Sequence, residues 1–451
     1  MTYLGRSVDA GTNCVRFLAS SGKRVALCAL LALASGIASS VAAPGGPDGS
    51  NSRPSFDAAT LERGAELAAV GGCSGCHTVE GGMPYAGGVP LGTPFGTIYG
   101  TNITPHATTG IGRWSEQDFV RAMREGVDRD GRHLYPAFPY PHFALVSDDE
   151  LHALYAYVMT RTPVDYVPPA NRLTFPFNVR PMLAVWNALY LRRDGYRPDP
   201  TQSAQWNRGA YVVQSLGHCG ACHSPLDALG AEKRDDYLGG GSAEGWYAPP
   251  LDATNPSPVP WTAEALATYL RRGIAPQHAM AGGPMQGVVQ ELAQASDDDV
   301  DAMAVYLVSL MGSPTPDREA RADQSLALAS SPNGDAPAVR SSARDQPQSG
   351  ASIYRGACAS CHAEGRRASS GTALQLSLAV AVHDADPGSL IRIIREGIIA
   401  PEAERSRWMP AFAGALTDEQ ITALVIYLRT LAPEAPPWHN VSEQVAKARP
   451  S

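Results

Sequence analysis

The sequence predicts an all-α protein with three tandem domains joined by long irregular loops. Three observations lead to this prediction: the pattern C-x-x-C-H occurs three times, similar helical patterns surround each copy, and 44 glycines and 37 prolines interrupt them. A chain of 451 residues, 44% of them apolar, is long enough to form several hydrophobic cores. Its formal net charge of -8 and the lack of a basic stripe argue against a nucleic-acid partner.

The first 42 residues have the features of a secretory signal peptide. Lys23 and Arg24 precede an apolar run over residues 25–34, and small residues follow as far as Ala42. Charged, apolar and small residues in this order are typical of an export signal. An uncleaved anchor is the alternative, but about ten apolar residues fall short of the ~20 that a spanning helix needs. We therefore expect an exported chain on the periplasmic side of the cytoplasmic membrane, associated with that membrane peripherally or through a partner.

Six of the eight cysteines fall into three identical motifs, and the other two, Cys14 and Cys28, lie in the signal segment. Two thiols at this spacing can add to the two vinyl groups of one porphyrin, which holds the adjacent imidazole against the iron as its proximal ligand. The motifs therefore predict three covalently bound haem c groups. The attaching residues are Cys73 and Cys76, Cys219 and Cys222, and Cys358 and Cys361, and the proximal ligands are His77, His223 and His362.

Two other functions of paired cysteines fit this sequence less well. A zinc module places its second cysteine pair ~15 to 20 residues after the first, whereas these pairs start 146 and 139 residues apart. A thioredoxin-like redox pair needs a βαβ context, but the flanking sequence is helical and shows no strand alternation. Both alternatives are therefore disfavoured.

The first helix of each domain is predicted just before its motif, over residues 61–70, 206–216 and 352–357. Each range contains an arginine followed by a glycine. These arginines are Arg63, Arg208 and Arg355. The recurrence of the pair in the same place supports an internal repeat.

Two more helices are predicted after each motif. The second helix covers residues 114–126, 261–273 and 389–397, and each copy ends in a glycine suited to a left-handed C-cap. The third helix opens with a hydroxyl cap, has an acid or amide three residues later, and places a tyrosine ten residues after the cap. The caps are Ser147, Ser296 and Thr417, of which the first and third are expected to form complete capping boxes.

The register of the repeat predicts distal iron ligands. Twelve residues after the glycine that ends the second helix stand Phe138, Met285 and Met409. A methionine thioether is a frequent sixth ligand, and it raises the reduction potential. A lone methionine is usually core filler, but the shared register and the adjacent prolines favour Met285 and Met409 as ligands. Met280 and Met303 are interpreted as core residues.

Phe138 cannot bind iron, so the first haem needs a different sixth ligand. His142 follows four residues later in the same proline-rich loop, and imidazole suits iron. We predict His142 as this ligand; the alternative is a solvent-facing histidine with no such role. The other candidates in this domain are Met83, Met123, His133 and Met159.

The two connections between domains differ in composition. Residues 169–198 carry enough apolar side chains to pack across the first two domains, whereas 313–349 is rich in Ala, Ser, Pro and Asp and has no helical stripe. The predicted division of the chain is 1–42 signal peptide, 56–168 first domain, 169–198 packed connection, 199–312 second domain, 313–349 flexible linker, 350–432 third domain and 433–451 C-terminal tail.

Three helices around one haem, repeated three times, resemble the plan of class I cytochrome c. Over residues 57–433 the sequence is similar to the three-haem cytochrome c subunit of bacterial membrane-associated periplasmic dehydrogenases. The segments that carry this resemblance include Trp206-Asn-Arg-Gly-Ala-Tyr211, Leu229-Gly-Ala-Glu-Lys233, Gly96-Thr-Ile-Tyr-Gly-Thr-Asn-Ile-Thr104 and Phe175-Pro-Phe-Asn178.

The resemblance implies electron transfer from a dehydrogenase catalytic subunit to membrane ubiquinone or a terminal oxidase. Members of this family accompany quinoprotein alcohol dehydrogenases, flavin-dependent gluconate and sugar dehydrogenases, and molybdenum hydroxylases that act on aldehydes or N-heterocycles. The loop over residues 135–143 is similar to the molybdenum branch, which makes that type of partner, with or without an iron–sulfur subunit, the favoured one. The alternative is a multihaem enzyme, such as a peroxidase, that uses an open first haem.

Overall fold

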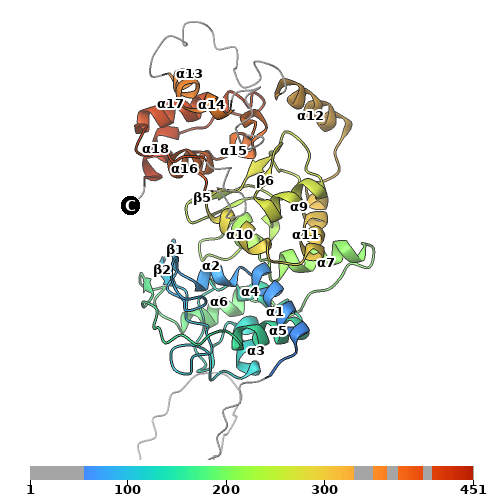
Figure 1. The fold of residues 1–451 in the computed structure, drawn as a ribbon, viewed down its shortest axis with the longest axis vertical. Helices are drawn as coiled ribbons and strands as arrows, with labels where there is room; N and C mark the ends of the chain where they lie inside the picture. The colour runs from blue at the N-terminus through green and yellow to red at the C-terminus, as the bar shows by residue number, and fades with distance from the viewer. Residues whose placement is uncertain (1–54, 330–348, 363–373, 400–408, 450–451) are drawn as a thin grey trace, which may run out of the picture. The chain divides into compact units, whose positions relative to one another are not determined.

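The computed structural model describes residues 55–329, 349–362, 374–399 and 409–449 (Figure 1). These residues belong to one compact unit, Arg53–Ser451. The predicted signal peptide lies outside the described residues. Within the described ranges, the chain is mainly helical, as predicted, and none of the helices is both long and apolar enough to cross a membrane.

The first helical segment carries the first cysteine motif. Its helices are α1 (Ala58–Val70), α2 (Cys73–His77), α3 (Glu116–Glu125), α4 (Tyr140–Phe143) and α5 (Asp148–Met159). Helices α1 and α5 cross in close contact because Gly64 has no side chain there: a Cβ atom on Gly64 would lie 2.1 Å from the carbonyl oxygen of Ala153. The crossing places the C-terminal end of α1 directly before Cys73 and so positions the motif.

The second segment repeats this arrangement around the second motif. Its helices are α7 (Ala204–Gln214), α8 (Gly220–His223), α9 (Ala263–Arg272), α10 (Pro284–Leu292) and α11 (Asp297–Leu310), with a 3-10 turn η1 (Arg234–Asp236). Gly209 allows α7 to cross α11, since a Cβ atom there would lie 1.9 Å from the carbonyl oxygen of Ala302. Gly64 and Gly209 therefore hold equivalent positions.

The third segment has the same crossing with shorter helices. They are α13 (Gly350–Ile353), a π-helical turn η3 (Tyr354–Cys358), α14 (Ala359–His362), a 3-10 turn η4 (Leu376–Leu378), α15 (Val380–His383), α16 (Gly388–Glu396), α17 (Asp418–Arg429) and α18 (Val441–Lys447). The glycine at the crossing is Gly350, whose Cβ atom would lie 2.1 Å from the carbonyl oxygen of Ala423. The predicted match of Arg355-Gly356 with the other Arg-Gly pairs is therefore wrong, and Ser349 stands where they have arginine.

The predicted helix caps are present. The side chains of Ser147, Ser296 and Thr417 each accept a hydrogen bond from the backbone N–H three residues later. Thr417 forms the complete box, but Ser147 does not, because the Glu150 carboxylate is bound to two arginines instead. An unpredicted complete box is present at Ser115.

The glycines at the ends of the second helices differ in one case. Gly126 and Gly273 adopt the left-handed conformation, with φ of 62° and 71°. Gly397 has a positive φ of 76°, but its ψ of -172° is extended. The chain there leaves α16 directly into an antiparallel bridge between Ile398 and Met409, which explains the extended ψ.

Short strands, which the sequence did not predict, join the helices. They are β1 (Pro90–Thr93), β2 (Gly96–Tyr99) and β3 (Arg172–Leu173) in one antiparallel sheet, and the hairpins β4 (Gly241–Ala243) with β5 (Trp246–Ala248) and β6 (Ile274–Ala275) with β7 (Ala279–Met280). In the first sheet Leu91 pairs with Ile98, and Gly96 pairs with Leu173. This sheet forms one wall of the site described below.

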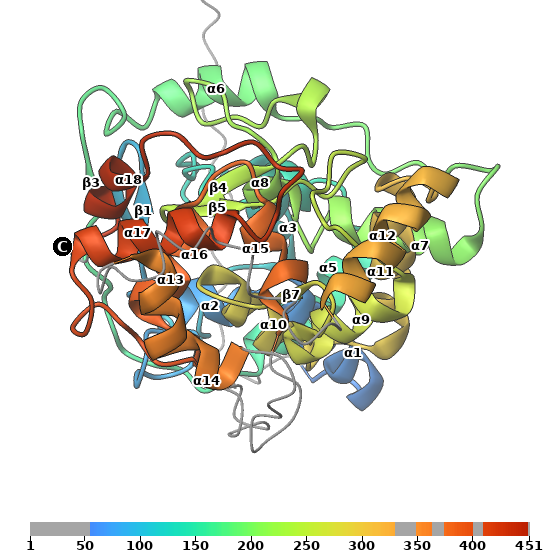
Figure 2. The ribbon, with the colours of Figure 1, turned by 90° about the horizontal axis from the view of Figure 1, so that it is seen from above.

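The connection between the first and second segments contains helix α6 (Met182–Tyr190), which lies along an edge of the view in Figure 2. The OH group of Tyr140 donates a 2.5 Å hydrogen bond to Asn187, and the indole N–H of Trp186 donates to the carbonyl oxygen of Leu229 at 3.0 Å. The connection therefore contacts both segments.

The second connection contains a helix where the sequence analysis expected irregular structure. Residues Pro316–Ala329 form α12, so the prediction of an irregular linker over 313–349 is wrong for this part. Thr315 begins the helix by accepting the backbone N–H groups of Arg318 and Glu319, and good helix formers continue it. Residues 330–348 lie outside the described part.

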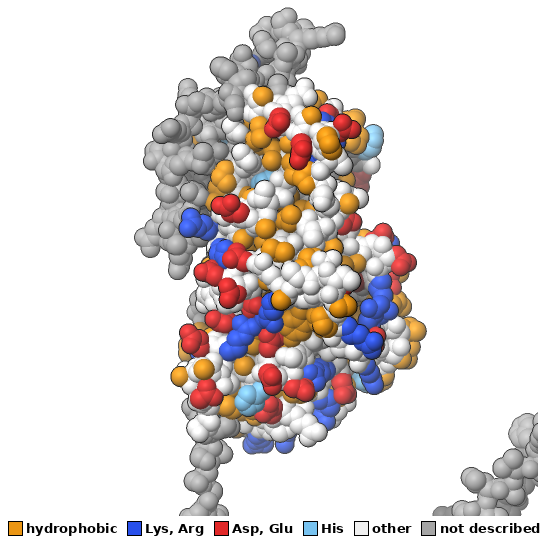
Figure 3. Space-filling model, turned by 90° about the vertical axis from the view of Figure 1, so that its right-hand side faces the viewer, with side chains coloured by type: hydrophobic (Ala, Val, Ile, Leu, Met, Phe, Trp, Pro, Cys, Tyr) orange, Lys and Arg blue, Asp and Glu red, His pale blue; other side chains and the backbone are white. Residues whose placement is uncertain are grey.

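The first two segments share one hydrophobic core, whereas the third has its own. They also share four charged side chains, which we call the arginine–acid cluster: Arg63, Glu150, Arg208 and Asp299. Figure 3 looks from the side on which Figure 1 labels α7 and α11, and it shows basic and acidic side chains next to one another. At the corresponding positions the third segment has Ser349 and Gln420, neither of which is charged.

Candidate haem sites

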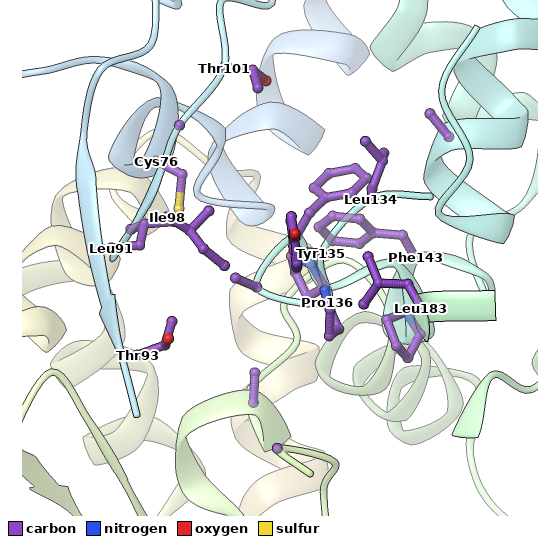
Figure 4. A pocket seen from close by; sticks show the side chains of 18 of the residues that line it. Cys76, Leu91, Thr93, Ile98, Thr101, Leu134, Tyr135, Pro136, Phe143 and Leu183 are labelled. Carbon is purple, nitrogen blue, oxygen red and sulfur yellow. The ribbon is translucent and has the colours of Figure 1, made fainter. Parts of the chain in front are cut away.

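The first two motifs open into one cavity with a volume of about 2070 Å³. Cys73, Cys76 and His77 line it from the first segment, and Cys222 lines it from the second. Figure 4 shows apolar side chains that surround the space from several elements. Among them are Leu91, Ile98, Leu134, Phe143 and Leu183. A large cavity with mostly apolar walls fits a flat, largely apolar macrocycle.

The thiols of all six cysteines in the motifs are free. Burial raises the pKa of Cys73 and of Cys219 to about 12, so both thiols are protonated at neutral pH. Cys73 lines the cavity, and Cys219 directly follows His218, which also lines it. The cysteine residues therefore fit covalent attachment of haem.

The three motif histidines make the same contact. In each, the Nδ1 atom lies close to a backbone carbonyl oxygen. The distance is 2.6 Å from His77 to the carbonyl oxygen of Thr101 and 2.7 Å from His223 to that of Pro249. It is 3.2 Å from His362 to the carbonyl oxygen of Leu374. A ligating histidine usually donates one ring N–H to such an acceptor, which fixes the ring and directs the other nitrogen at the metal. Burial also lowers the pKa of His77 and of His223, which favours the neutral imidazole that iron needs.

The first and second motifs lie close to each other. The thiols of Cys76 and Cys222 interact electrostatically with each other and with Glu244, and burial is the largest cause of the raised pKa of both thiols. Two more contacts close the same interface: Ser74 Oγ meets the carboxylate of Glu291, and the Phe95 ring lies against Gly230. The two motifs therefore lie side by side, although Cys222 lines the cavity and His223 does not.

The backbone gives a second register for the distal methionines. Antiparallel bridges pair the residue after the helix-ending glycine with His133 in the first segment, Met280 in the second and Met409 in the third. The loop between the glycine and the bridge is longer in the third segment than in the second. A count of twelve residues from the glycine therefore matches Met409 with Met285, which is the second residue of α10. The structure thus makes Met280 the backbone counterpart of Met409. Met285 and Met409 stay predictions as ligands.

His142 lies at the cavity wall, as does Phe138. Its Nδ1 atom is 2.7 Å from the carbonyl oxygen of Gln214, and its Nε2 atom contacts the carboxylate of Glu232. Burial lowers the pKa of His142, but the Glu232 carboxylate and the Gln214 carbonyl together raise it above its ordinary value, which favours the protonated ring. Its role as an iron ligand stays a prediction, and it requires Nε2 to leave Glu232.

Glu232 and the acids of the arginine–acid cluster are functional residues that no pattern in the sequence predicted. Glu232 lies in the segment 229–233, which carried part of the resemblance but had no chemical signature of its own. Glu150 and Asp299 were recognised only as third residues of capped helices. Only the tertiary structure shows that these acids pair with arginines of another segment. The one sequence feature that could have indicated a shared role is their equivalent position in the repeat.

Comparison with known proteins agrees with this geometry. A cytochrome c family model matches residues 61–162, and the model of cbb3-type cytochrome c oxidase subunit III matches residues 345–428. The first and third segments are therefore cytochrome c domains, which bind haem covalently. The protein is therefore a c-type cytochrome.

Relatives define the family more closely. A subunit of the nicotinate dehydrogenase of Pseudomonas putida is 46% identical over 88% of this chain, but this chain spans only about a third (32%) of that protein. The gluconate 2-dehydrogenase cytochrome c subunit of Pantoea cypripedii is 39% identical over 82% of this chain and 85% of its own length. The fructose dehydrogenase cytochrome subunit of Gluconobacter japonicus is 34% identical over 82% and 78%. The chain belongs to the family of dehydrogenase cytochrome c subunits.

Proposed function

We propose that this chain is a three-haem cytochrome that passes electrons from a periplasmic dehydrogenase catalytic subunit to membrane ubiquinone or another respiratory acceptor. The observation that carries the proposal is the repeated site: each of three C-x-x-C-H motifs follows a glycine-mediated helix crossing and presents a histidine whose Nδ1 atom contacts a backbone carbonyl. Each segment is then a class I cytochrome c domain. The domains span about 56–168, 199–312 and 350–432.

The residues of the chain hold and insulate the haems. The cysteines would attach each haem, and the motif histidines would bind iron through Nε2, because the carbonyl oxygens of Thr101, Pro249 and Leu374 hold their Nδ1 atoms. Haem iron supplies reversible one-electron chemistry when bound. Because Cys76 and Cys222 lie close together, haems attached at the first two motifs would be neighbours, which would favour direct electron transfer between them.

The partner that we favour is a molybdenum hydroxylase. Nicotinate is an N-heterocyclic acid, and the nicotinate dehydrogenase relative has a higher identity, 46%, than the gluconate and fructose relatives, at 39% and 34%. This order supports a catalytic subunit that oxidises N-heterocycles or aldehydes, with or without an iron–sulfur subunit. Quinoprotein and flavin dehydrogenases are the alternatives. Purification of the native complex, with its subunits identified by mass spectrometry, decides among the three.

The proposed place of work is outside the cytoplasmic membrane. The segment 1–42 supports export, and haem attachment to C-x-x-C-H motifs belongs to that compartment. We expect the mature chain to associate with the membrane peripherally.

The number and state of the haems test the function. Mass spectrometry of protein matured in its own host should show three haem additions, and fewer would contradict the proposal. Carbon monoxide added to the reduced protein should leave all three haems unchanged, because an electron carrier has six-coordinate iron. Conversion of about one third of the haem would favour the peroxidase-type alternative with an open first haem.

A further inference from the structure

A buried asparagine holds the loop that supplies the acceptor of the first motif histidine. The carbonyl oxygen that contacts His77 belongs to Thr101, and the next residue, Asn102, is only 4% exposed. The Asn102 amide donates to the carbonyl oxygens of Val164 at 2.8 Å and Tyr166 at 3.0 Å. These two residues follow helix α5, so the amide ties the loop to the chain beyond that helix.

The acceptor atom of the same side chain is also used. Asn102 Oδ1 accepts hydrogen bonds from the backbone N–H of Thr104 at 2.9 Å and from its hydroxyl at 2.7 Å. The Thr104 hydroxyl in turn accepts the backbone N–H of Val164 at 3.1 Å, and Thr104 is fully buried. A buried amide whose hydrogen bonds are all made fixes the backbone around it. A Cβ atom on Gly100 would lie 1.8 Å from the carbonyl oxygen of Cys76, so the fixed loop lies directly against the motif.

The second segment has an equivalent asparagine. Asn255 is 8% exposed, and its amide donates a 2.7 Å hydrogen bond to the carbonyl oxygen of Pro250. Pro250 directly follows Pro249, whose carbonyl oxygen contacts Nδ1 of His223. Asn255 Oδ1 accepts the backbone N–H of Ser257 at 3.1 Å, so it binds the residue two positions later, as its counterpart in the first segment does.

The third segment has no asparagine at this place. An asparagine, any residue, a hydroxyl residue and a proline follow one another at 102–105 and 255–258, whereas the third segment reads Asp384-Ala-Asp-Pro387 and contains no asparagine over 350–432. Asp384 is 2% exposed, but its Oδ1 atom has no hydrogen-bond partner among the described residues. The Nδ1 contact of the third motif histidine is also longer, at 3.2 Å against 2.6 and 2.7 Å. The shorter contacts therefore accompany the asparagines.

We propose that Asn102 and Asn255 are positioning residues that set the reduction potentials of the first two haems through His77 and His223. The inference rests on the proposed function, and it adds two residues that control those haems. A carbonyl oxygen that accepts the Nδ1 proton makes the imidazole a stronger donor to iron, and a stronger donor stabilises oxidised iron. Each asparagine keeps that carbonyl in place, so each holds the potential of its haem below the value that a looser contact would give.

Redox titration of the purified haem-loaded protein tests this proposal. Asn102→Ala releases the loop that carries the Thr101 carbonyl, so the potential of one haem should rise. The ratio of reduced to oxidised iron in that haem should increase about threefold or more at a fixed applied potential. Asn255→Ala should do the same to a different haem. The third haem should keep its potential in both variants, because its histidine is held without an asparagine.

A gentler variant and a matched control separate positioning from loss of stability. Thr104→Val removes the hydroxyl that donates to Asn102 Oδ1 but keeps a β-branched side chain, so it should raise the potential of the same haem by less. The control is Asn207→Ala in α7. The Asn207 side chain donates to the carbonyl oxygen of Asp199 at 2.8 Å and accepts its backbone N–H at 2.6 Å, but it holds no histidine acceptor. Its loss should lower the midpoint of thermal unfolding without moving any potential.

The outcomes distinguish this proposal from the proposed function. Three haem additions by mass spectrometry and reduction by the dehydrogenase test the function alone. If these hold but Asn102→Ala and Asn255→Ala lower the potentials, or move them no more than Asn207→Ala does, the positioning role is wrong. Should an alanine variant not mature with three haems, Thr104→Val decides, because an unchanged potential in that variant overturns the proposal equally.

Discussion

Arg63 in α1 forms an ion pair with Asp299 in α11 at 2.9 Å, and Arg208 in α7 forms the reciprocal pair with Glu150 in α5, also at 2.9 Å. Each arginine also binds the acid of its own segment. The two halves of the cluster are thus related by the internal repeat. The first two segments contribute equivalent residues to the cluster, an arginine from the repeated Arg-Gly pair and an acid from the repeated helix cap. Exchanging the two segments would therefore leave the contacts approximately unchanged.

The cluster should contribute measurably to stability. The Asp299 side chain is 5% exposed, and its replacement in Asp299→Asn leaves two guanidinium groups with one acid fewer. Loss of one partner of a buried pair costs ~3 to 5 kcal/mol, and because the arginines are about a third exposed we expect about 2 kcal/mol. Urea denaturation followed by circular dichroism measures the change. Asp301→Asn, which removes an exposed pair with Arg271, should cost less than about 1 kcal/mol.

The same residue should make stability depend on pH. Burial alone would raise the pKa of Asp299, but Arg208 and Arg63 lower it below the ordinary 3.8. A carboxyl group with a lowered pKa stabilises the fold fully above its ordinary pKa, and this contribution is lost as the pH falls through the folded value. The parent should therefore lose more stability than Asp299→Asn as the pH is lowered from about 5 through and below the ordinary pKa of the carboxyl group. Parallel loss in both proteins would contradict the assignment.

A glycine pair tests the corrected register of the third segment. Gly350→Ala places a Cβ atom 2.1 Å from the carbonyl oxygen of Ala423, whereas Gly356 has no heavy atom within 4 Å of such a position. Overpacking costs ~1 to 3 kcal/mol or more, so Gly350→Ala should lower the midpoint of thermal unfolding and Gly356→Ala should not. If Gly356→Ala proved the more damaging of the two, the match of Arg355-Gly356 with the other Arg-Gly pairs would be restored.

Methionine variants test the distal ligands. Axial ligands change the reduction potential of haem over a range of ~0.8 V. Met409→Leu should lower the reduction potential of one haem by about a tenth of that range or more, and it should open a site for carbon monoxide. Met285→Leu should do the same for the middle haem, with Met280→Leu as the matched control. A potential that moves only in Met280→Leu would show that the backbone register, not the count of twelve residues, identifies the ligand.

The first haem tests the assignment of His142. If His142 binds its iron, that haem has two imidazole ligands and should have the lowest of the three potentials. His142→Ala should then abolish its low-spin spectrum, and redox titration should show one haem moved. Retention of both the potential and the spectrum would leave His142 as a partner of Glu232 only, and the ligand would have to be sought at His133 or Met83.

The sequence alone determined the local features of this protein. The three motifs, the caps at Ser147, Ser296 and Thr417 and the second helices are short-range patterns, and the structure places them as predicted. Such features depend on neighbouring residues, so a single chain is enough to identify them. The third register failed because Arg355-Gly356 lies in the π-helical turn η3, beyond the crossing that Gly350 makes in α13.

Only the tertiary structure decided the relations between distant residues. Nothing near Glu232 in the chain indicates that it meets His142, ninety positions away, or that one cavity joins the first two motifs. The same is true of Glu150, whose carboxylate leaves its own helix cap for Arg63 and Arg208. For Glu150 the outcome depends on groups from other helices, because Arg63, Arg208 and the OH group of Tyr211 all bind its carboxylate, and the backbone N–H of Ser147 donates to Tyr211 instead.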